Sequence, residues 1–128
     1  YDAWSDLSVI ENENLRFKYS YLDIETTKKN LAEFSNHSIY NKGFIPEVFS
    51  KSENPEKVNW LHIDLNSAEA TISTLEFFYE RIVNNGIILF DDYGGFEKTR
   101  VNIDNFFSDK KGHFINFPTG QGIFYKKN

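Results

Sequence analysis

Three aspartates, each following an apolar segment, are the residues in this sequence best suited to chemistry. Asp64 ends Val58–Asp64, and the pair Asp91 and Asp92 follows Gly86–Phe90. Two carboxylates about 4 Å apart repel each other by about 4 kcal/mol at an effective dielectric constant of about 20, so clustered aspartates need a counter-charge. A divalent cation is the simplest one, and oxygen ligands alone suit Mg²⁺ better than zinc. The alternative is that Asp64 and Asp92 cap the following helices, although capping needs only one residue and does not explain the pair Asp91 and Asp92.

The segments around these acids predict two strands joined by a helix. Val58–Asp64 is a short, bounded apolar run, as expected of a buried strand, and Gly86–Phe90 has the unbroken apolar pattern of a parallel strand covered on both faces. Between them, Ser67–Val83 has apolar residues at helical spacing and is followed by the stop signal Asn84-Asn85-Gly86. Ligands of open α/β sheets bind outside the carboxyl ends of parallel strands. One helical crossover would therefore bring the three acids to one point.

The rest of the chain extends this alternation on both sides. We expect a helix at Asp23–Phe34 with Asp23 as its N-cap, a brief strand at Ser38–Tyr40, a helical turn from Pro46, a helix at Phe96–Asp109, and a hairpin of His113–Phe117 with Gly122–Lys126. This order predicts an α/β fold with a mostly parallel sheet that ends in an antiparallel hairpin. A length of 128 residues predicts one domain over residues 1–128.

The composition excludes several classes of partner. Lys and Arg number 14 against 19 Asp and Glu, and the lysines are scattered, so no basic surface for nucleic acid is expected. There is no cysteine for a disulfide or a thiolate metal site, and no apolar run approaches the roughly 18 residues of a membrane span. We therefore expect a cytoplasmic protein without a membrane partner. The chain begins at Tyr1 and contains no Met, which suggests a segment of a longer protein.

Five stretches resemble successive blocks of class I S-adenosylmethionine-dependent methyltransferases of the macrocin O-methyltransferase kind. They are YDAW at the start, then GFIPEVF, WLHIDLNS, IILFDDYGG and FPTGQGIFYKK. The resemblance covers nearly the whole chain and implies a Rossmann-like sheet, S-adenosylmethionine as cofactor, and transfer of a methyl group to a hydroxyl of a sugar or another small metabolite. It also assigns roles to single residues: Asp64, Asp91 and Asp92 would hold Mg²⁺, Asp2 would reach the cofactor ribose, Gly43 and Phe44 would border the adenine, and Asp64 would serve both cofactor binding and catalysis.

The sequence departs from this family where the general base is expected. Many members carry an acid two positions after the first aspartate, and here that position is Asn66, whose amide cannot accept a proton at neutral pH. Asn66 and Glu69 could instead form an N-capping pair. His62 would share a strand face with Asp64 and is a possible base or substrate contact, although a buried, hydrogen-bonded strand histidine is the simpler interpretation. His37 and His113 are expected at the surface.

A second departure is the glycine-rich loop that holds the methionine end of the cofactor in such enzymes. Gly120-Gln121-Gly122 is the one Gly-x-Gly in the sequence, and it lies between two expected strands, so it predicts a turn. We therefore expect the later part of a methyltransferase domain, without the first strand and its loop. Such a chain would be inactive alone and would bind S-adenosylmethionine weakly or not at all. Its exposed sheet edges would favour a homodimer.

Three other classes of protein use similar acids. A phosphoryl-transfer receiver domain has its paired aspartates after the first strand, whereas only 36 residues follow Asp92 here, which argues against that class. A Mg²⁺-dependent hydrolase would use the same carboxylates, although no Asp-x-Asp motif is present. A non-catalytic α/β binding module would be favoured if the acids did not converge.

Overall fold

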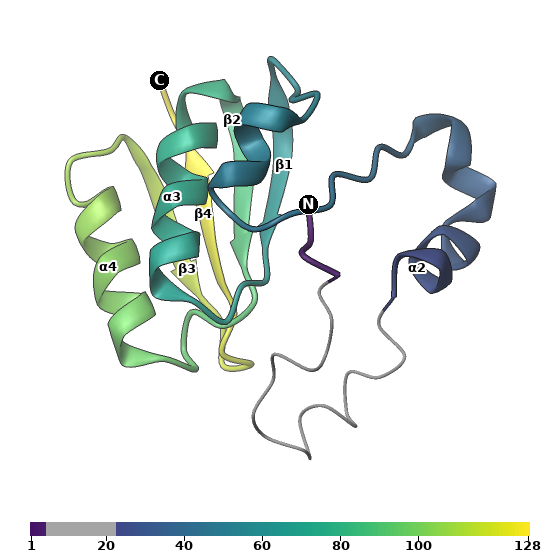
Figure 1. The fold of residues 1–128 in the computed structure, drawn as a ribbon. Helices are drawn as coiled ribbons and strands as arrows, with labels where there is room; N and C mark the ends of the chain where they lie inside the picture. Colours follow the sequence, from purple (N-terminus) through teal and green to yellow (C-terminus); the bar gives the residue numbers. More distant parts are fainter. Residues whose placement is uncertain (5–22) are drawn as a thin grey trace. The chain divides into compact units, whose positions relative to one another are not determined.

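The computed structural model describes residues 1–4 and 23–128, which divide into two compact units (Figure 1). One unit is Tyr1–Glu53 and the other is Asn54–Asn128, and each is described by itself. The single domain expected over residues 1–128 stays a prediction. Among the described residues, none of the helices combines the length and the apolar character needed to cross a membrane.

Asn54–Asn128 is an α/β unit built on a four-stranded sheet. Its strands are β1 (Val58–Ile63), β2 (Ile82–Phe90), β3 (Gly112–Asn116) and β4 (Gly122–Lys126), in the spatial order β1-β2-β4-β3. The β1/β2 pair is parallel, whereas β2/β4 and β3/β4 are antiparallel. The predicted α/β fold, with a parallel beginning and a closing antiparallel hairpin, is thus confirmed.

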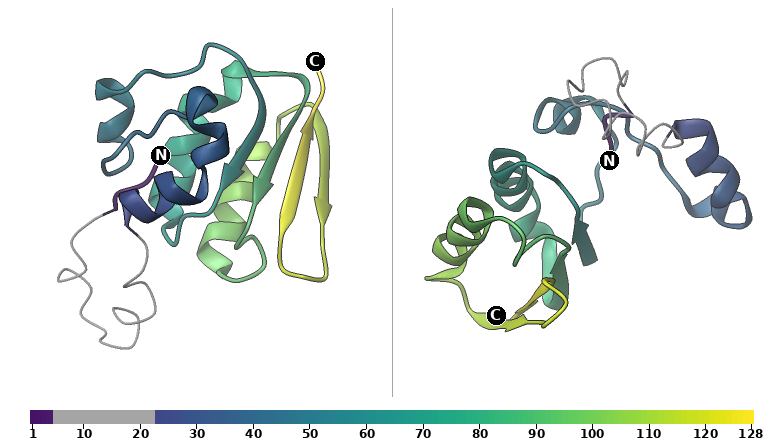
Figure 2. Two further views of the ribbon diagram at one scale, coloured as in Figure 1. Left: turned by 90° about the vertical axis from the view of Figure 1, so that its right-hand side faces the viewer. Right: turned by 90° about the horizontal axis from the view of Figure 1, so that it is seen from below.

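Two helices, α3 (Ala68–Phe78) and α4 (Glu97–Phe107), lie side by side on one face of this sheet (Figure 2). The core between helices and sheet is apolar and rich in aromatic rings, and the rings of Phe107 and Phe124 stack with centroids 3.9 Å apart. Fully burying one such side chain contributes about 1.5–3 kcal/mol. The least exposed members of this core are Leu75, Phe78, Ile82, Ile88, Phe90 and Ile103.

The opposite face of the sheet is less covered than the sequence predicts. Ile88 and Phe90 of β2 are buried, but Ile87 and Leu89, which point the other way, are partly exposed, and Trp60 of β1 is 55% exposed. The expectation that Gly86–Phe90 is covered on both faces is therefore wrong for this unit. Its α-helices cover one face only, and β1 forms an outer edge of the sheet.

The helix expected at Ser67–Val83 is shorter than predicted. Its N-cap is Ser67, whose Oγ accepts a hydrogen bond from the backbone N–H of Ala70 (3.2 Å), and α3 ends at Phe78. A 3₁₀ turn, η4 (Tyr79–Arg81), follows and leads directly into β2. Because Ile82 continues the helical spacing of apolar residues, the sequence pattern does not distinguish the last helical residue from the first strand residue.

The stop signal Asn84-Asn85-Gly86 lies inside β2 rather than before it. Val58 pairs with Ile82 and Trp60 with Ile87, so one residue of β1 faces the four residues 83–86 of β2. Asn85 adopts a φ of 67°, in the left-handed region that asparagine tolerates better than most residues. The turn residues therefore form an irregularity within the strand.

Tyr1–Glu53 contains one short α-helix and two 3₁₀ turns among its described residues. α2 (Ile24–Asn30) begins as predicted at Asp23, whose carboxylate accepts a hydrogen bond from the N–H of Thr26 (2.8 Å). It ends earlier than the predicted Phe34, because the chain continues as the 3₁₀ turn η2 (Ala32–His37). The helical turn expected from Pro46 is η3 (Glu47–Lys51).

The strand predicted at Ser38–Tyr40 does not form. The described residues of this unit form one isolated parallel bridge, between Asp2 and Lys42, and Lys42 lies two residues after the predicted strand. A strand requires a run of backbone hydrogen bonds with a neighbouring strand, and the described residues of this unit supply only one bridge.

Candidate functional site

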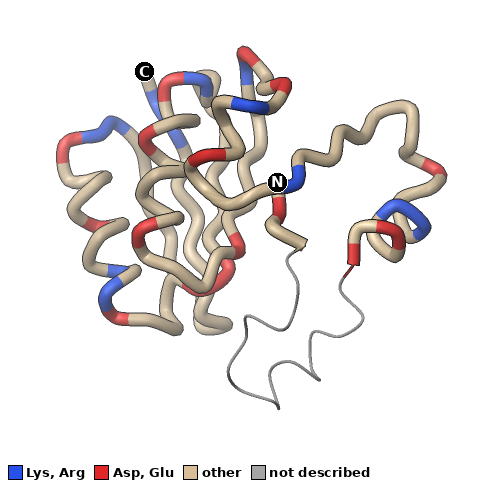
Figure 3. The backbone as a smooth tube through the Cα atoms, in the orientation of Figure 1, with Lys and Arg blue, Asp and Glu red and all other residues tan. Residues whose placement is uncertain are grey.

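Asp64, Asp91 and Asp92 meet at the carboxyl ends of β1 and β2. The last residues of these strands, Ile63 and Phe90, are paired, and the N–H of Asp91 donates to the carbonyl of Ile63 (3.0 Å), which sets the two strand ends level. One carboxylate oxygen from each aspartate lies within 4.8 Å of the others. Figure 3 shows acidic residues gathered at this end of the sheet. The structure thus brings together the three aspartates that the sequence singled out.

Unbalanced negative charge defines the electrostatics of this acidic cluster. Asp64 is exposed, and Asp91 and Asp92 are half-buried. The pKa of Asp92 is raised above its usual range, first by burial of its carboxyl and then by the charges of Asp64 and Asp91. An approaching cation would reverse the last two effects, so the cluster is arranged to receive positive charge.

Helix capping does not explain these acids. The N-cap of α3 is Ser67, and α4 begins after Phe96 without a side-chain cap. The interpretation of Asp64 and Asp92 as helix caps is therefore wrong. The proposed capping pair of Asn66 and Glu69 is also wrong, because the N-cap lies one residue after Asn66. Glu69 instead forms an ion pair with Lys98 of α4.

Tyr93 anchors the loop that carries the Asp pair. It is buried, its ring packs against Phe114 of β3 at a centroid distance of 4.6 Å, and its hydroxyl donates to Oδ1 of Asp104 on α4 (2.6 Å). Burial of the ring and this hydrogen bond raise the pKa of Tyr93 to about 12. Tyr93 is thus protonated at neutral pH and serves as a fixed donor that ties the loop to α4.

The β3–β4 turn contacts the same loop through a residue that sequence reasoning missed. Nε2 of Gln121 donates to Oδ1 of Asp91 (2.8 Å), and the N–H of Gly94 donates to the carbonyl of Gly120 (2.7 Å). The sequence carried one usable signal. If β4 is antiparallel to β2, the turn before β4 must lie at the carboxyl end of β2, next to the acids.

The histidines and Asn66 are all exposed. His62 lies on β1 two residues before Asp64 and is exposed, in contrast to the buried strand histidine that the sequence favours. The face of the sheet that carries the His62 side chain points away from α3 and α4 (Figure 2), which explains the difference. Asn66 is exposed in the loop before α3, and His37 and His113 are exposed as expected.

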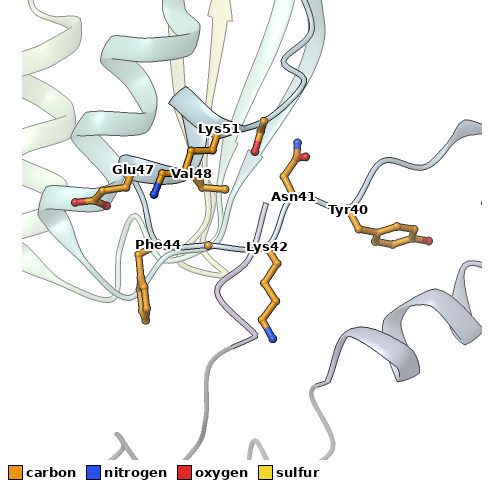
Figure 4. A pocket seen from close by; sticks show the side chains of 9 residues that line it. Tyr40, Asn41, Lys42, Phe44, Glu47, Val48 and Lys51 are labelled. Atoms are coloured by element: carbon orange, nitrogen blue, oxygen red, sulfur yellow. The ribbon is translucent and has the colours of Figure 1, made fainter.

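The residues expected at the cofactor, apart from Asp64, belong to Tyr1–Glu53. Asp2 lies beside Gly43, because the N–H of Gly43 donates to the carbonyl of Asp2 (3.0 Å). Oδ1 of Asp2 accepts from the N–H of Trp4 (2.9 Å). Gly43 and Phe44 line a cavity of about 690 Å³ together with residues of η3 (Figure 4). Phe44 is 65% exposed.

Parallel strands joined by a crossover helix, acids at their carboxyl ends and a closing antiparallel hairpin define a fragment of a Rossmann-like methyltransferase fold. The family model of macrocin O-methyltransferases (TylF) matches residues 11–126, and the chain belongs to this family. The solved structure of the O-methyltransferase NovP matches with a TM-score of 0.68 and 18% sequence identity, over 89% of this chain and 50% of that chain. At this identity the likeness shows the fold. The chain thus spans half the length of that structure. Comparison with curated proteins gives no match.

Proposed function

We propose that the protein transfers a methyl group from S-adenosylmethionine to a hydroxyl of a sugar or another small metabolite, with Mg²⁺ held by Asp64, Asp91 and Asp92. The proposal is supported by the family to which the chain belongs. The observation that carries it is the convergence of three carboxylates, from two strand ends, to within 4.8 Å. This convergence argues against a non-catalytic binding module, which would not need three carboxylates close together.

The residues present fit a magnesium ion. The donor set consists of carboxylate oxygens alone, which suits a hard divalent cation. The pKa of Asp92 is raised, first by burial and then by the charges of Asp64 and Asp91, and a bound cation would offset the repulsion between these charges. When bound, Mg²⁺ would orient the substrate hydroxyl and lower its pKa.

The side chains of the chain would share the remaining work. Asp64, Asp91 and Asp92 would bind the ion and so orient the substrate hydroxyl. His62 is proposed to accept the proton of that hydroxyl, since the amide of Asn66 cannot. In the reaction, the bond between the substrate oxygen and the methyl carbon forms while the bond between carbon and sulfur breaks. Positioning of the two reactants would supply much of the rate enhancement.

For the cofactor we propose roles for three residues of Tyr1–Glu53. Asp2 would accept hydrogen bonds from the ribose hydroxyls, and Gly43 and Phe44 would border the adenine. The hydrogen bond between Gly43 and Asp2 supports a shared site within this unit, and the cavity beside Gly43 and Phe44 offers room for a planar group. The cytoplasmic location, the absence of a nucleic-acid partner and the homodimer stay predictions.

The first test removes single carboxylates from the intact protein. We expect Asp64→Asn and Asp91→Asn each to abolish Mg²⁺-dependent methylation of hydroxylated acceptors by S-adenosylmethionine and to weaken Mg²⁺ binding, measured by calorimetry. The matched control is Asp109→Asn, an exposed aspartate bonded to Lys110, which should change neither. Full methylation activity in excess chelator would exclude the metal role.

A further inference from the structure

The β3–β4 turn and the acidic loop after β2 are in direct contact. Because Phe90 of β2 pairs with Gly122 of β4 in antiparallel fashion, the turn before Gly122 lies at the same sheet edge as the acidic cluster. Two hydrogen bonds join the turn to the loop, from Gly94 N–H to the Gly120 carbonyl (2.7 Å) and from Gln121 Nε2 to Asp91 Oδ1 (2.8 Å). One bond holds the loop backbone, and the other holds an acid of the cluster.

The side-chain amide of Gln121 is fixed at both of its ends. Its Nε2 donates to Asp91, and its Oε1 accepts from the hydroxyl of Thr119 (3.1 Å). The flipped amide would turn Oε1 toward the carboxylate, where two acceptors repel each other, whereas the Thr119 hydroxyl can either donate to Oε1 or accept from Nε2. The Asp91 carboxylate therefore sets the orientation of the amide, and Thr119 holds its far end.

The turn that presents Gln121 is itself tightly closed. The N–H of Gly120 donates to the carbonyl of Phe117 (3.0 Å), and the N–H of Phe117 donates to the carbonyl of Gln121 (2.9 Å). Gly120 has a φ of 93°, a backbone conformation that residues with a side chain rarely adopt. A Cβ on Gly94 would lie 3.1 Å from the Cα of Gly120. The close approach of the two backbones fixes the distance from Gln121 to Asp91.

We propose that Gln121 is a positioning residue for the divalent-cation site, with Thr119 holding the far end of its amide. This inference rests on the proposed function, because it assigns Gln121 to the cation that Asp64, Asp91 and Asp92 would hold. The three carboxylates repel one another, and Asp91 would rotate away without a partner. A neutral amide holds Asp91 in place and adds no positive charge that would compete with the cation.

The test measures the affinity of the intact protein for Mn²⁺ and Mg²⁺, each titrated alone by calorimetry. Gln121→Leu keeps a side chain of similar size but cannot donate, and we expect it to weaken cation affinity by about 10- to 100-fold, as loss of a group that orients a ligand typically does. Thr119→Val should weaken affinity by a smaller factor, and Thr119→Ser, which keeps the hydroxyl, should restore it. The thermal midpoint in chelator, measured for every variant, reports any purely structural effect.

The possible outcomes separate this inference from the proposed function. If the unaltered protein binds cations and Gln121→Leu lowers the midpoint in chelator but leaves affinity unchanged, the turn is structural and the positioning role is overturned, while the cation site stands. If Gln121→Leu fails to fold, equal affinities of Thr119→Val and Thr119→Ser overturn the role of the amide. If the unaltered protein binds neither cation, the metal part of the proposed function fails, and this inference fails with it.

Discussion

Residues outside the acidic cluster hold its members in place. Asp91 is fixed through its backbone by the carbonyl of Ile63 and through its side chain by Gln121. Tyr93, the next residue after the Asp pair, is tied to Asp104 on α4. These contacts keep like charges close together, and the pKa of Asp92 is raised, first by burial of its carboxyl and then by the charges of Asp64 and Asp91.

The pKa of Asp92 predicts how stability depends on pH in the absence of cations. A carboxyl whose pKa is raised in the folded protein destabilises the fold when it is ionised, and this penalty disappears as the pH falls through the raised pKa toward the ordinary value of 3.8. In chelator, Asp92→Asn should therefore raise the thermal midpoint at neutral pH. The gain should shrink toward about pH 4, where the native carboxyl also becomes neutral. Thermal unfolding followed by circular dichroism across this range measures both effects.

Asp109→Asn is the matched control for this pH experiment. Asp109 is exposed, and its hydrogen bond with Lys110 lowers the pKa of its carboxyl, so its charge is stabilising above the ordinary pKa. Its substitution should leave the midpoint at neutral pH unchanged or slightly lower. A lower midpoint for Asp92→Asn at neutral pH would contradict the expectation, since it would mean that the ionised carboxylate makes a favourable contact in the folded protein.

The sequence predicted some residues of the site and missed others for physical reasons. Asp64, Asp91 and Asp92 were predictable because each follows an apolar run, and the ends of parallel strands share one edge. Gln121 was missed because its partner Asp91 lies 30 residues away, and only the pairing of β2 with β4 brings them together. The exposure of His62 was likewise missed, because strand periodicity does not say which sheet face a helix covers.

At the scale of elements, the boundaries depended on context that local patterns lack. The start of α3 was predicted within one residue from the helical spacing of apolar residues, although the N-cap is Ser67 and not Asn66. The end of α3 was not predicted, because it depends on a contact distant in sequence. Lys126 of β4 donates to the carbonyls of Tyr79 (2.9 Å) and Ile82 (3.0 Å) and helps to hold the chain where η4 leads into β2. The closing hairpin was predicted well, since its turn residues are strong local signals.

The hairpin packs so closely that Gly112 has no room for a side chain. A Cβ there would overlap the ring of Phe124 and lie 2.5 Å from the carbonyl oxygen of Tyr125. Phe124 has little freedom to move, because its ring stacks on Phe107. We expect Gly112→Ala to lower the free energy of unfolding by about 1–3 kcal/mol, the usual cost of overpacking, as measured by urea denaturation.

Gly95→Ala is the control for the hairpin experiment. A Cβ at Gly95 would meet its nearest neighbour, the carbonyl oxygen of Asp92, at 3.6 Å, which is ordinary van der Waals contact. This variant should change the free energy of unfolding by less than about 0.5 kcal/mol, as is usual for surface positions. Equal stability of Gly112→Ala and Gly95→Ala would show that the strands can separate to accept a methyl group.

At the scale of the whole molecule, the residues proposed to take part in function are divided between the two units. Asp64, Asp91 and Asp92 belong to Asn54–Asn128, whereas the residues proposed at the adenosine, Asp2, Gly43 and Phe44, belong to Tyr1–Glu53. The one Gly-x-Gly of the sequence is part of the β3–β4 hairpin, where it shapes a turn. Among the described residues, none is therefore proposed at the methionine end of the cofactor.

This division predicts how the 128-residue chain by itself treats the cofactor. If it contacts only the adenosine part, S-adenosylmethionine and 5′-methylthioadenosine should bind with similar dissociation constants, both weaker than about 10 μM, because the amino acid part of the cofactor adds no contact. Isothermal titration calorimetry with the two ligands measures this directly. Asp2→Asn should weaken both equally, since it removes a charged acceptor proposed for the ribose hydroxyls that they share. Low-micromolar binding of S-adenosylmethionine with much weaker binding of 5′-methylthioadenosine would mean that residues of this chain recognise the methionine end, and the proposed division of the cofactor site would be wrong.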